Sequence, residues 1–247
     1  MAKKITRQLG ELNELNVACL IHDSKYDFQY VYHLYNAVDR HTKPKINFHV
    51  FTEPDRIVPK PFIHHKLEEW PGIRGPRASW WYKIQMFNPS FINEQMLYLD
   101  LDTVIVNNID WLWQQKTKYF WTIRDFKYLF KSRRETINSS VMWFNPTNYS
   151  HVYHDFNPTQ VQGVPRWHGD QDYITEKIPK DNIKFLDQTR ILSWKWQVQD
   201  GGIDWRTRRP FLPGTGTVQE PHHSIYIFHG KPNPHQVEDP VIREHWR

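Results

Sequence analysis

Two carboxylates, Asp100 and Asp102, interrupt the apolar run over residues 96–106. A run of this length that is rich in Leu, Val and Ile predicts a buried strand, and side chains two positions apart on a strand point to the same side. A buried strand cannot keep two ionised carboxylates unless something neutralises them. Two hard oxygen donors on one side suit Mg²⁺ or Mn²⁺, which can in turn hold phosphate oxygens. The alternative is an acidic pair at a strand end that caps a turn.

A basic segment near the carboxyl end of the chain could complete such a site. His229, Gly230 and Lys231 follow the apolar residues 225–228. An imidazole can join two carboxylates around a metal ion, a lysine can neutralise a phosphate, and a glycine allows close approach of the backbone. The alternative is a surface turn whose basic residues are incidental.

Three other polar segments have a structural and a chemical interpretation each. Asp170 precedes a helical pattern, which by itself favours a helix N-cap. Asp23 and Tyr26 follow the first strand pattern, at the sheet edge where α/β proteins bind ligands. There Tyr26 could stack on a base and Asp23 could accept a hydrogen bond from the base, although a turn and a helix cap explain Asp23 equally well. Asn138 begins the segment Asn-Ser-Ser, which by itself indicates only a turn before a strand.

Alternating strand and helix patterns must position these residues. The order of the patterns predicts a single α/β domain that begins with a βαβ unit. We expect irregular loops over residues 54–76, with one short strand, and over residues 200–221. The strands are predicted over residues 16–22, 46–51, 96–106, 119–124, 141–144, 183–186, 191–196 and 224–228, and the helices over residues 27–40, 79–87, 147–156 and 171–177.

Composition narrows the class of protein. The 247 residues carry a net charge of 32 − 27 = +5, which favours an anionic ligand but is too small and dispersed to indicate nucleic acid binding. The single cysteine, Cys19, and the absence of an apolar leader or an 18-residue apolar run predict a cytoplasmic protein without a membrane span. Aromatic residues make up 15% of the chain, including 12 Trp. Four of these Trp could stack on an acceptor sugar, although we expect at least two of the four to be core residues: Trp80, Trp81, Trp194 and Trp205.

Together these segments resemble GT-A glycosyltransferases, most closely the family 8 group that includes galactosyl- and glucosyltransferases and glycogenin. Tyr98-Leu99-Asp100-Leu101-Asp102 is similar to the family's D-x-D motif. The chain departs from the family at three places: Lys83 stands where the family usually has Arg, Ser140 replaces a Gly, and the carboxyl-terminal motif at His229 to Pro232 is shortened and lacks its Trp. The other residues that match family motifs, in chain order, are Asp23 with Tyr26, Lys83 on the helix before the D-x-D segment, Asp125, Ile137 to Asn145, Asp170-Gln171-Asp172, and His229-Gly230-Lys231-Pro232.

The resemblance implies a GT-A-like domain with a mixed central sheet flanked by helices. Residues 1–110 would form the Rossmann-like half that binds the nucleotide-sugar, and residues 111–247 the acceptor and catalytic half. The implied reaction moves a galactose or glucose from a nucleotide-sugar, UDP-linked by default, to a hydroxyl of a sugar, lipid-linked glycan or protein, with retention of configuration.

The resemblance also implies roles for single residues. Asp100, Asp102 and His229 would hold Mn²⁺ or Mg²⁺. Gln171 would stabilise positive charge at the anomeric carbon, and Asn138 would hold hydroxyls of donor or acceptor. The remaining donor-binding residues would be Asp23 and Tyr26 at the base, Asp170, Lys83 and Asp125 at the sugar, and Lys231 with Gly230 at the diphosphate.

Two other classes of protein share some of these features. A haloacid-dehalogenase-type phosphatase also carries D-x-D followed by Thr or Val, as Asp100 to Val104 do, but its nucleophilic Asp lies on the first strand, whereas a whole βαβ unit precedes Asp100. A non-catalytic protein that binds glycans or nucleic acid would explain the basic charge and the aromatic residues. It would leave the acidic pair unexplained.

Overall fold

The computed structural model describes residues 14–73, 78–129, 136–161, 167–198 and 222–247. Its amino-terminal part is the predicted βαβ unit, in which β1 (Glu14–Leu20) and β2 (Lys45–Thr52) are parallel and α1 (Gln29–His41) connects them. The helix forms because its apolar side chains recur at helical spacing and bury one face. The buried residues of α1 are Tyr30, Val31, Leu34, Ala37 and Val38.

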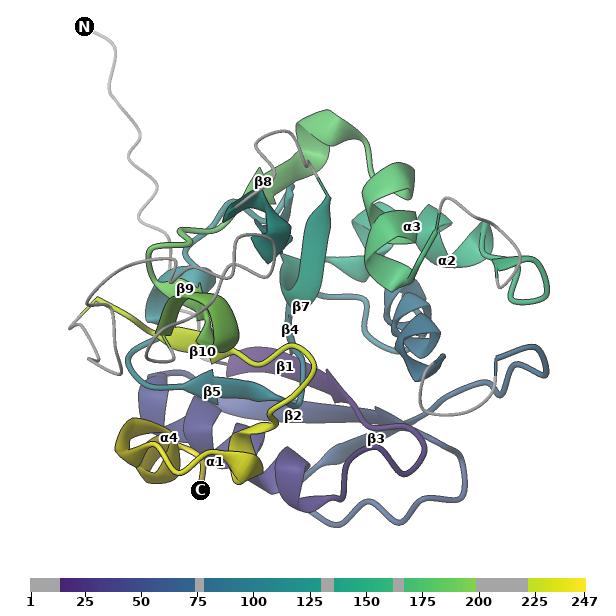
Figure 1. Ribbon diagram of the computed structural model, residues 1–247. Helices are drawn as coiled ribbons and strands as arrows, with labels where there is room; N and C mark the ends of the chain where they lie inside the picture. Colours follow the sequence, from purple (N-terminus) through teal and green to yellow (C-terminus); the bar gives the residue numbers. More distant parts are fainter. Residues whose placement is uncertain (1–13, 74–77, 130–135, 162–166, 199–221) are drawn as a thin grey trace, which may run out of the picture.

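Seven strands form the central sheet, in the order β3-β2-β1-β4-β7-β6-β8 (Figure 1). β7 is antiparallel to both of its neighbours, and the other pairs are parallel. The sheet is therefore mixed, as predicted, and it takes strands from both sides of residue 110. The strands not yet given are β3 (Ile63–Lys66), β4 (Met96–Leu99), β6 (Phe120–Arg124), β7 (Ile137–Phe144) and β8 (Ile183–Phe185).

A second, three-stranded sheet lies beside the first. It consists of β5 (Thr103–Ile105), β10 (Ile225–Ile227) and β9 (Ile191–Ser193), with β10 in the middle. β10 is antiparallel to β5 and parallel to β9. Segments far apart in the sequence thus meet beside the end of β4.

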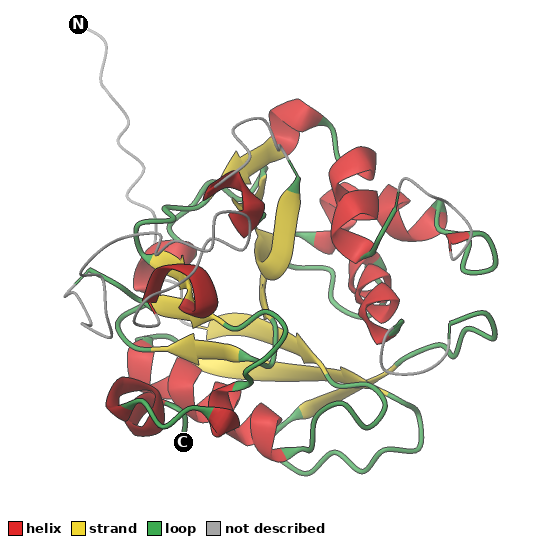
Figure 2. Cartoon of the chain, in the orientation of Figure 1, coloured by secondary structure: helices red, strands yellow, loops and turns green. Residues whose placement is uncertain are grey.

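Helices cover both faces of the large sheet (Figure 2). α1 and α4 (Pro240–His245) contact the side that bears β5, and η1 (Ser79–Phe87), α2 (His151–His154) and α3 (Asp170–Lys177) lie together on the other side. Each face has its own apolar core, because successive strand residues point to opposite faces. The shorter helical turns are η2 (Asp110–Leu112), η3 (Phe126–Leu129), η4 (Pro146–Tyr149), η6 (Lys180–Asn182), the π-helix η7 (Trp194–Val198) and η8 (Pro234–Gln236).

The prediction of one strand over residues 96–106 is wrong. The chain leaves the large sheet after Leu99 and joins the small sheet at Thr103, so that Asp100 and Asp102 lie in the turn between β4 and β5. A hydrogen bond from the backbone N–H of Thr103 to the carbonyl oxygen of Asp100 (3.2 Å) closes this turn. The apolar residues on both sides of the turn would be buried in one continuous strand as well as in two separate strands, so the hydrophobic pattern alone does not reveal the break.

Three smaller expectations also need correction. Asn138 and the two serines after it belong to β7 instead of preceding it. The strand expected over residues 191–196 ends at Ser193 and continues as η7, and the helix expected over residues 147–156 is divided into η4 and α2. α4 is an additional helix that the sequence pattern does not predict. It is a two-turn helix that begins with Pro240 and is capped by Asp239, whose Oδ1 accepts from the N–H of Val241 at 2.9 Å.

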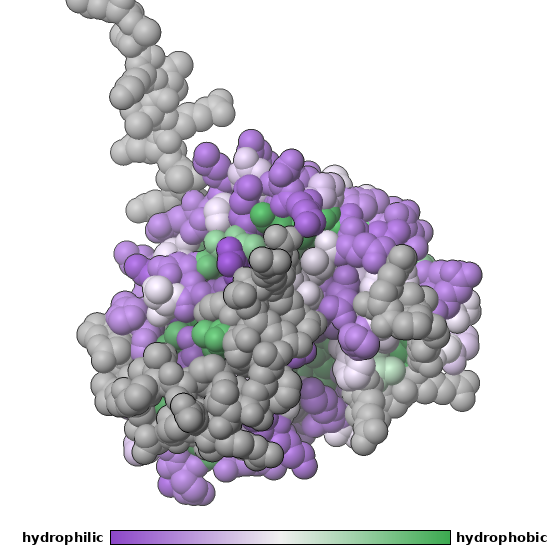
Figure 3. Space-filling model, turned by 45° about the horizontal axis from the view of Figure 1, so that its top comes forward, coloured by the Kyte–Doolittle hydropathy of each residue, from purple (hydrophilic) through white to green (hydrophobic). Residues whose placement is uncertain are grey.

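No helix among the described residues is long and apolar enough to cross a membrane. On the face shown in Figure 3, hydrophilic residues predominate and the hydrophobic ones form small separate areas. The expected cytoplasmic location and the expected division of the chain at residue 110 stay predictions.

Candidate functional site

The turn between the two sheets presents both acidic residues of the D-x-D segment. The N–H of Asp100 donates to the carbonyl oxygen of Ser140 in β7 (2.9 Å), and the N–H of Phe228, directly after β10, donates to the carbonyl oxygen of Asp102 (3.3 Å). The turn is thereby fixed to one strand of each sheet. Because these backbone groups are paired, the turn holds both side chains at the place where the two sheets meet.

Lys83 connects Asp100 to Asp170. Its Nζ lies 2.8 Å from Oδ1 of Asp100 and 3.5 Å from Oδ2 of Asp170, and it donates to Oγ of Ser139 at 3.1 Å. Ser139 in turn donates to Oδ2 of Asp170 at 2.5 Å, and the hydroxyl of Tyr98 donates to Oδ1 of Asp100 at 2.6 Å. The residues of this buried network come from η1, β7, the start of α3 and the end of β4. It therefore sets the relative positions of four separate segments.

Burial and mutual attraction set the protonation states in this network. Burial opposes the charge on Lys83, but Asp100 and Asp170 outweigh it and raise the pKa of the amine above its usual value. Burial also opposes ionisation of Asp100, yet Lys83 and the hydroxyl of Tyr98 hold the pKa of that carboxyl below its usual value. For Asp170 burial is the larger effect, so its pKa is raised although Lys83 and Ser139 favour the ionised form.

Asp102 has weaker compensation than Asp100. Its side chain is buried, and its Oδ2 accepts a hydrogen bond from the hydroxyl of Tyr26 at 2.7 Å. Burial and the neighbouring charge of Asp100 raise the pKa of Asp102 to about 6, although Lys25 and Tyr26 favour ionisation. Of the two neighbouring carboxylates only Asp100 has a lysine in contact, so the pair leaves excess negative charge, which a divalent cation would neutralise. The donor set at this turn therefore fits Mg²⁺ or Mn²⁺.

A cavity of about 610 Å³ opens over this turn. Its wall contains most of the residues that the sequence analysis selected. Gln171 lies in the first turn of α3, and Asn138 in β7 accepts a hydrogen bond from the N–H of Ser140 at 2.9 Å. The predicted residues in the wall are Tyr26, Lys83, Asp100, Asp102, Asn138, Asp170, Gln171, His229 and Gly230.

The helix-cap interpretation of Asp170 is wrong. The helix α3 has Gly169 as its N-cap residue, with no side-chain cap, and Asp170 is the first helical residue. The carboxylate of Asp170 instead points to Ser139 and Lys83, as the distances above show. A pattern of acidic residues at a helix start does not distinguish these two outcomes, because only tertiary contacts decide between them.

Three predicted binding residues lie outside the wall of this cavity as far as the described residues define it. Asp23 has a left-handed backbone conformation (φ 61°), and its Oδ1 accepts from the N–H of Ser24 at 2.7 Å. This confirms the turn interpretation of Asp23, but α1 begins later, at Gln29. Asp125 is buried at the start of η3, where its Oδ1 accepts from the N–H of Lys127 at 3.0 Å. Lys231 is exposed.

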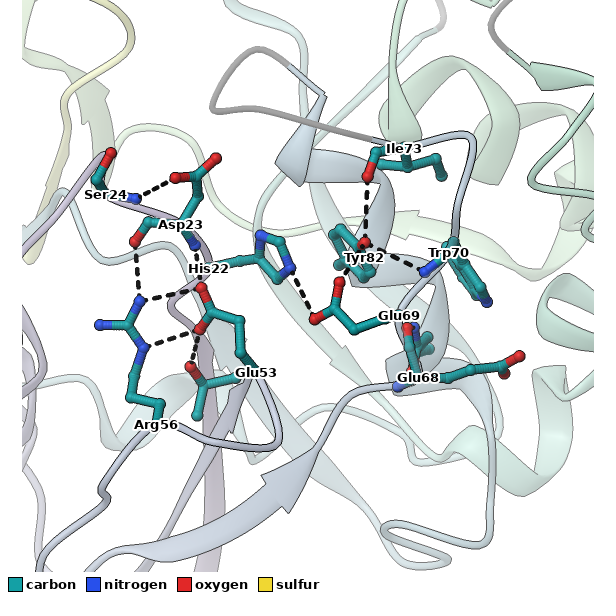
Figure 4. A network of polar contacts seen from close by, with 12 residues as sticks. His22, Asp23, Ser24, Glu53, Arg56, Glu68, Glu69, Trp70, Ile73 and Tyr82 are labelled. Atoms are coloured by element: carbon teal, nitrogen blue, oxygen red, sulfur yellow. Dashed lines mark hydrogen bonds and ion pairs between the residues drawn. The ribbon is translucent and has the colours of Figure 1, made fainter.

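Figure 4 shows how the end of β1 is held. Glu53 accepts from the N–H of Asp23 and forms an ion pair with Arg56 (2.8 Å), and Arg56 also donates to the carbonyl oxygen of Asp23 at 2.9 Å. Beside this group, the ring of His22 stacks on that of Tyr82, with 3.9 Å between the centroids. The turn after β1 is thus fixed by the half-buried Glu53 and by Arg56. His22 contributes to the cavity wall.

His229 lines the cavity and contacts both polar and aromatic side chains. Its Nε2 is 2.6 Å from Oγ of Ser193, and its ring packs against Phe126 and Trp196. Burial, with Lys195 nearby, lowers the pKa of His229 to about 4, so the ring is neutral at pH 7. No group of three or more His, Cys, Asp or Glu side chains within the described ranges has the geometry to hold a metal ion. The set Asp100, Asp102 and His229 therefore stays a prediction.

Several cavity residues were not selected from the sequence. Ser139 directly follows Asn138, and both of these residues line the cavity. Lys127 lies two residues after Asp125 and lines the wall, whereas Asp125 does not. Lys25 precedes Tyr26 and its Nζ lies 4.6 Å from the centre of the Tyr26 ring. Only a structure shows which side chains of such a segment face the cavity.

Solved structures show which fold this is. LgtC, a galactosyltransferase whose structure holds donor and acceptor sugar analogues, aligns over 93% of both chains with a TM-score of 0.62 at 14% identity. The glycosyltransferase GlyE of Streptococcus pneumoniae aligns over 94% of this chain and 60% of its own, with a TM-score of 0.66 at 15% identity. The bifunctional glycosyltransferase WbbM aligns over 90% of this chain and 47% of its own, with a TM-score of 0.57 at 12% identity. The chain has a GT-A fold.

These similarities concern the fold. No model of a protein family matches the sequence, and no curated protein matches it either. The GT-A fold nevertheless confirms the predicted architecture and favours neither the phosphatase nor the non-catalytic binding protein. Activity must be argued from the site, because one fold can serve several chemistries.

Proposed function

We propose that this GT-A protein is a metal-dependent glycosyltransferase that moves galactose or glucose from a UDP-sugar to a hydroxyl acceptor with retention of configuration. One observation carries the proposal: the carboxylate pair of half-buried Asp100 and buried Asp102, linked through Lys83 to Asp170, lies in the wall of a cavity of about 610 Å³ that is large enough for such a donor. The same arrangement would be costly for a protein that needed only a stable core.

Asp100 and Asp102, with His229, would hold Mn²⁺ or Mg²⁺. When bound, such an ion would stabilise the negative charge that develops on the leaving diphosphate. The chain's own contribution is the fixed position of the two carboxylates, since Lys83 and Tyr98 orient Asp100 and Tyr26 orients Asp102.

Two cationic side chains of the cavity wall suit the diphosphate. Lys25 and Lys127 both line the cavity, from the turn before α1 and from η3. Lys231 is exposed and lies outside the wall among the described residues, although the family motif assigns the diphosphate to this position. We therefore assign the charge compensation at the diphosphate to Lys25 and Lys127 in this chain.

Asp170 and Gln171 have different environments, which supports different roles. Oδ2 of Asp170 already contacts both Ser139 and Lys83, so this carboxylate is suited to orient sugar hydroxyls and poorly suited to attack the anomeric carbon. The amide of Gln171 lies in the cavity wall and could stabilise an oxocarbenium-like transition state without forming a covalent bond. This favours attack by the acceptor on the same face as the leaving group.

The proposal can be tested without knowledge of the acceptor. Slow hydrolysis of a panel of UDP-, GDP- and CDP-hexoses, with and without Mn²⁺, reports the donor. We expect one UDP-hexose to be hydrolysed only with the metal and not at all by an Asp102→Ala variant. Trp111→Phe is a matched control, because Trp111 lies outside the cavity and donates to Oγ of Ser224. Turnover of phosphate monoesters without turnover of any nucleotide-sugar would favour the phosphatase instead.

A further inference from the structure

Trp80 lines the cavity and is more exposed than the tryptophan beside it in the sequence. Large hydrophobic side chains that are exposed within the described ranges are Ile57, Ile63 and Trp80, and of these three Trp80 lines the cavity. Trp80 retains 36% of its surface, whereas its neighbour Trp81 retains 4%. An indole ring left open at a cavity wall is unfavourable for folding, which suggests that a ligand covers it.

A series of contacts along the cavity wall connects Tyr26 to Trp80. Tyr26 bonds to Asp102, which adjoins the Asp100–Lys83–Asp170 network described above. Gly169 precedes Asp170, and a Cβ atom added to it would lie 3.4 Å from Nε1 of Trp80. The series of contacts therefore runs from Tyr26 through the carboxylate pair and Lys83 to Trp80. A base near Tyr26 and a diphosphate near Asp102 would leave Trp80 beyond the transferred sugar.

Polar residues line the cavity next to Gly169, the residue whose added Cβ would lie near the Trp80 ring. They are His168 and Asp172, and the N–H of His168 donates to Oδ2 of Asp172 at 2.9 Å. The indole of Trp167 donates to Oε2 of Glu176 at 2.8 Å, so the segment before α3 is tied to the helix at two successive residues. An aromatic ring beside an imidazole and a carboxylate suits a pyranose, whose C–H face packs on the ring while its hydroxyls bond to the polar groups.

We propose that Trp80, His168 and Asp172 form a subsite for a pyranose ring of the acceptor. The acceptor is then a carbohydrate, and the hydroxyl that attacks belongs to the ring on Trp80 or to its neighbour. This inference rests on the proposed function, because it assumes a nucleotide-sugar donor with its base near Tyr26 and its diphosphate near Asp102. It adds the chemical class of the acceptor, which the resemblance to the family left open.

The test compares Trp80→Ala and Trp80→Phe with the unmodified protein and with Trp111→Phe. The probes are methyl α- and β-glucosides and galactosides together with lactose, maltose and cellobiose, offered with the UDP-hexose that is hydrolysed. We expect Trp80→Ala to lower the ratio of transfer to hydrolysis about tenfold for the best probe, and Trp80→Phe to lower it less because a ring is kept. Trp111→Phe should keep the original ratio.

Binding without donor gives an independent measurement. Saturation-transfer NMR should show contact of the C–H protons of the best probe with the unmodified protein and a loss of this signal in Trp80→Ala. Asp172→Asn keeps the indole ring and should also lower the ratio, which keeps the test valid if Trp80→Ala does not fold.

Four results would overturn this assignment. They are an unchanged ratio in Trp80→Ala, equal loss of transfer and hydrolysis, a lower affinity of Trp80→Ala for UDP alone, and the absence of both binding and transfer for every sugar probe. The third would indicate that the base of the donor stacks on Trp80. A lack of donor hydrolysis by the unmodified protein would instead refute the proposed function itself.

Discussion

Replacement of Asp102 by Asn should stabilise the metal-free protein while it removes the metal site. Asp102 is buried beside Asp100, and burial and that neighbouring charge both oppose its ionisation. Asn has nearly the same shape, and its amide oxygen can still accept the hydrogen bond from Tyr26 that now has a length of 2.7 Å. The variant therefore removes a charge from the site without removing much packing.

The size of the effect follows from the pKa of Asp102. A rise from the usual value of 3.8 to about 6 corresponds to at most about 3 kcal/mol, at about 1.4 kcal/mol per pH unit. Asp100 and Asp102 interact with each other and with Lys83, so part of this energy belongs to the pair. We therefore expect the metal-free Asn variant to gain about 1–3 kcal/mol in the free energy of unfolding at pH 7.5. For a protein of this size that is a rise of roughly 2–10 °C in Tm.

The direction of the pH dependence is fixed by the same pKa. A carboxyl whose pKa is higher in the folded state binds its proton more tightly there, so its protonated form favours folding at low pH. This contribution is complete below pH 3.8 and is lost as the pH rises to about 6. The unmodified protein should therefore lose stability relative to the Asn variant across this interval. Above about pH 7 the difference between the two should be constant.

Thermal unfolding of both proteins, in chelator and in about 1 mM Mn²⁺, measures these differences. The metal should raise the Tm of the unmodified protein and leave that of Asp102→Asn nearly unchanged, because a ligand that binds only the folded state stabilises it. If the Asn variant is less stable than the unmodified protein at pH 7.5 in chelator, the argument from uncompensated charge is wrong. Equal stabilisation of both proteins by Mn²⁺ would remove Asp102 from the metal site.

Three further predictions concern the roles of single side chains. Gln171→Ala should lower kcat about 10–100-fold and leave the donor KM within about twofold, since its interaction forms in the transition state; a normal kcat would exclude it from the reaction. Lys83→Met and Asp170→Asn should each weaken donor binding, and a double-mutant cycle should give a coupling of about 1 kcal/mol or more; additivity would show that their contact has no functional role. Lys127→Met should weaken UDP binding about 5–10-fold in calorimetry and Lys231→Met less than about twofold; the opposite order would restore the family's assignment of the diphosphate.

The sequence predicts the βαβ unit and most strands because their apolar residues recur at the spacing of each element. It does not predict where the run of residues 96–106 breaks, since both parts of this run are buried, one in each sheet. The polarity of Asn138 and the serines after it suggests a turn, yet these residues belong to β7, where Ser139 bonds to Lys83 and Asn138 accepts from the N–H of Ser140. Local pattern fails at these two places because tertiary contacts stabilise an arrangement that is unusual for the residue types.

The site was predicted more accurately by segment than by side chain. Each selected motif of two or more residues has at least one residue at the cavity, whereas Asp125, which was selected alone, does not line it and Lys127 does. The reason is that a motif gives the position of a turn, whereas the direction of each side chain depends on backbone angles inside that turn. The left-handed conformation of Asp23 is an example, because it turns this residue toward Ser24 while Tyr26 reaches Asp102.

Lys83 also gives the substitution of lysine for the family's arginine a physical meaning. A guanidinium could hold two carboxylates through separate N–H groups in a fixed plane, whereas the single ammonium of Lys83 must lie between Asp100 at 2.8 Å and Asp170 at 3.5 Å. Ser139 bridges the longer of these two gaps, since it accepts from Lys83 and donates to Asp170. The hydroxyl thus supplies the second connection that an arginine would have made by itself. The charge state of the carboxylate pair therefore depends on where α3 holds Asp170, which links the proposed metal site to the proposed sugar site.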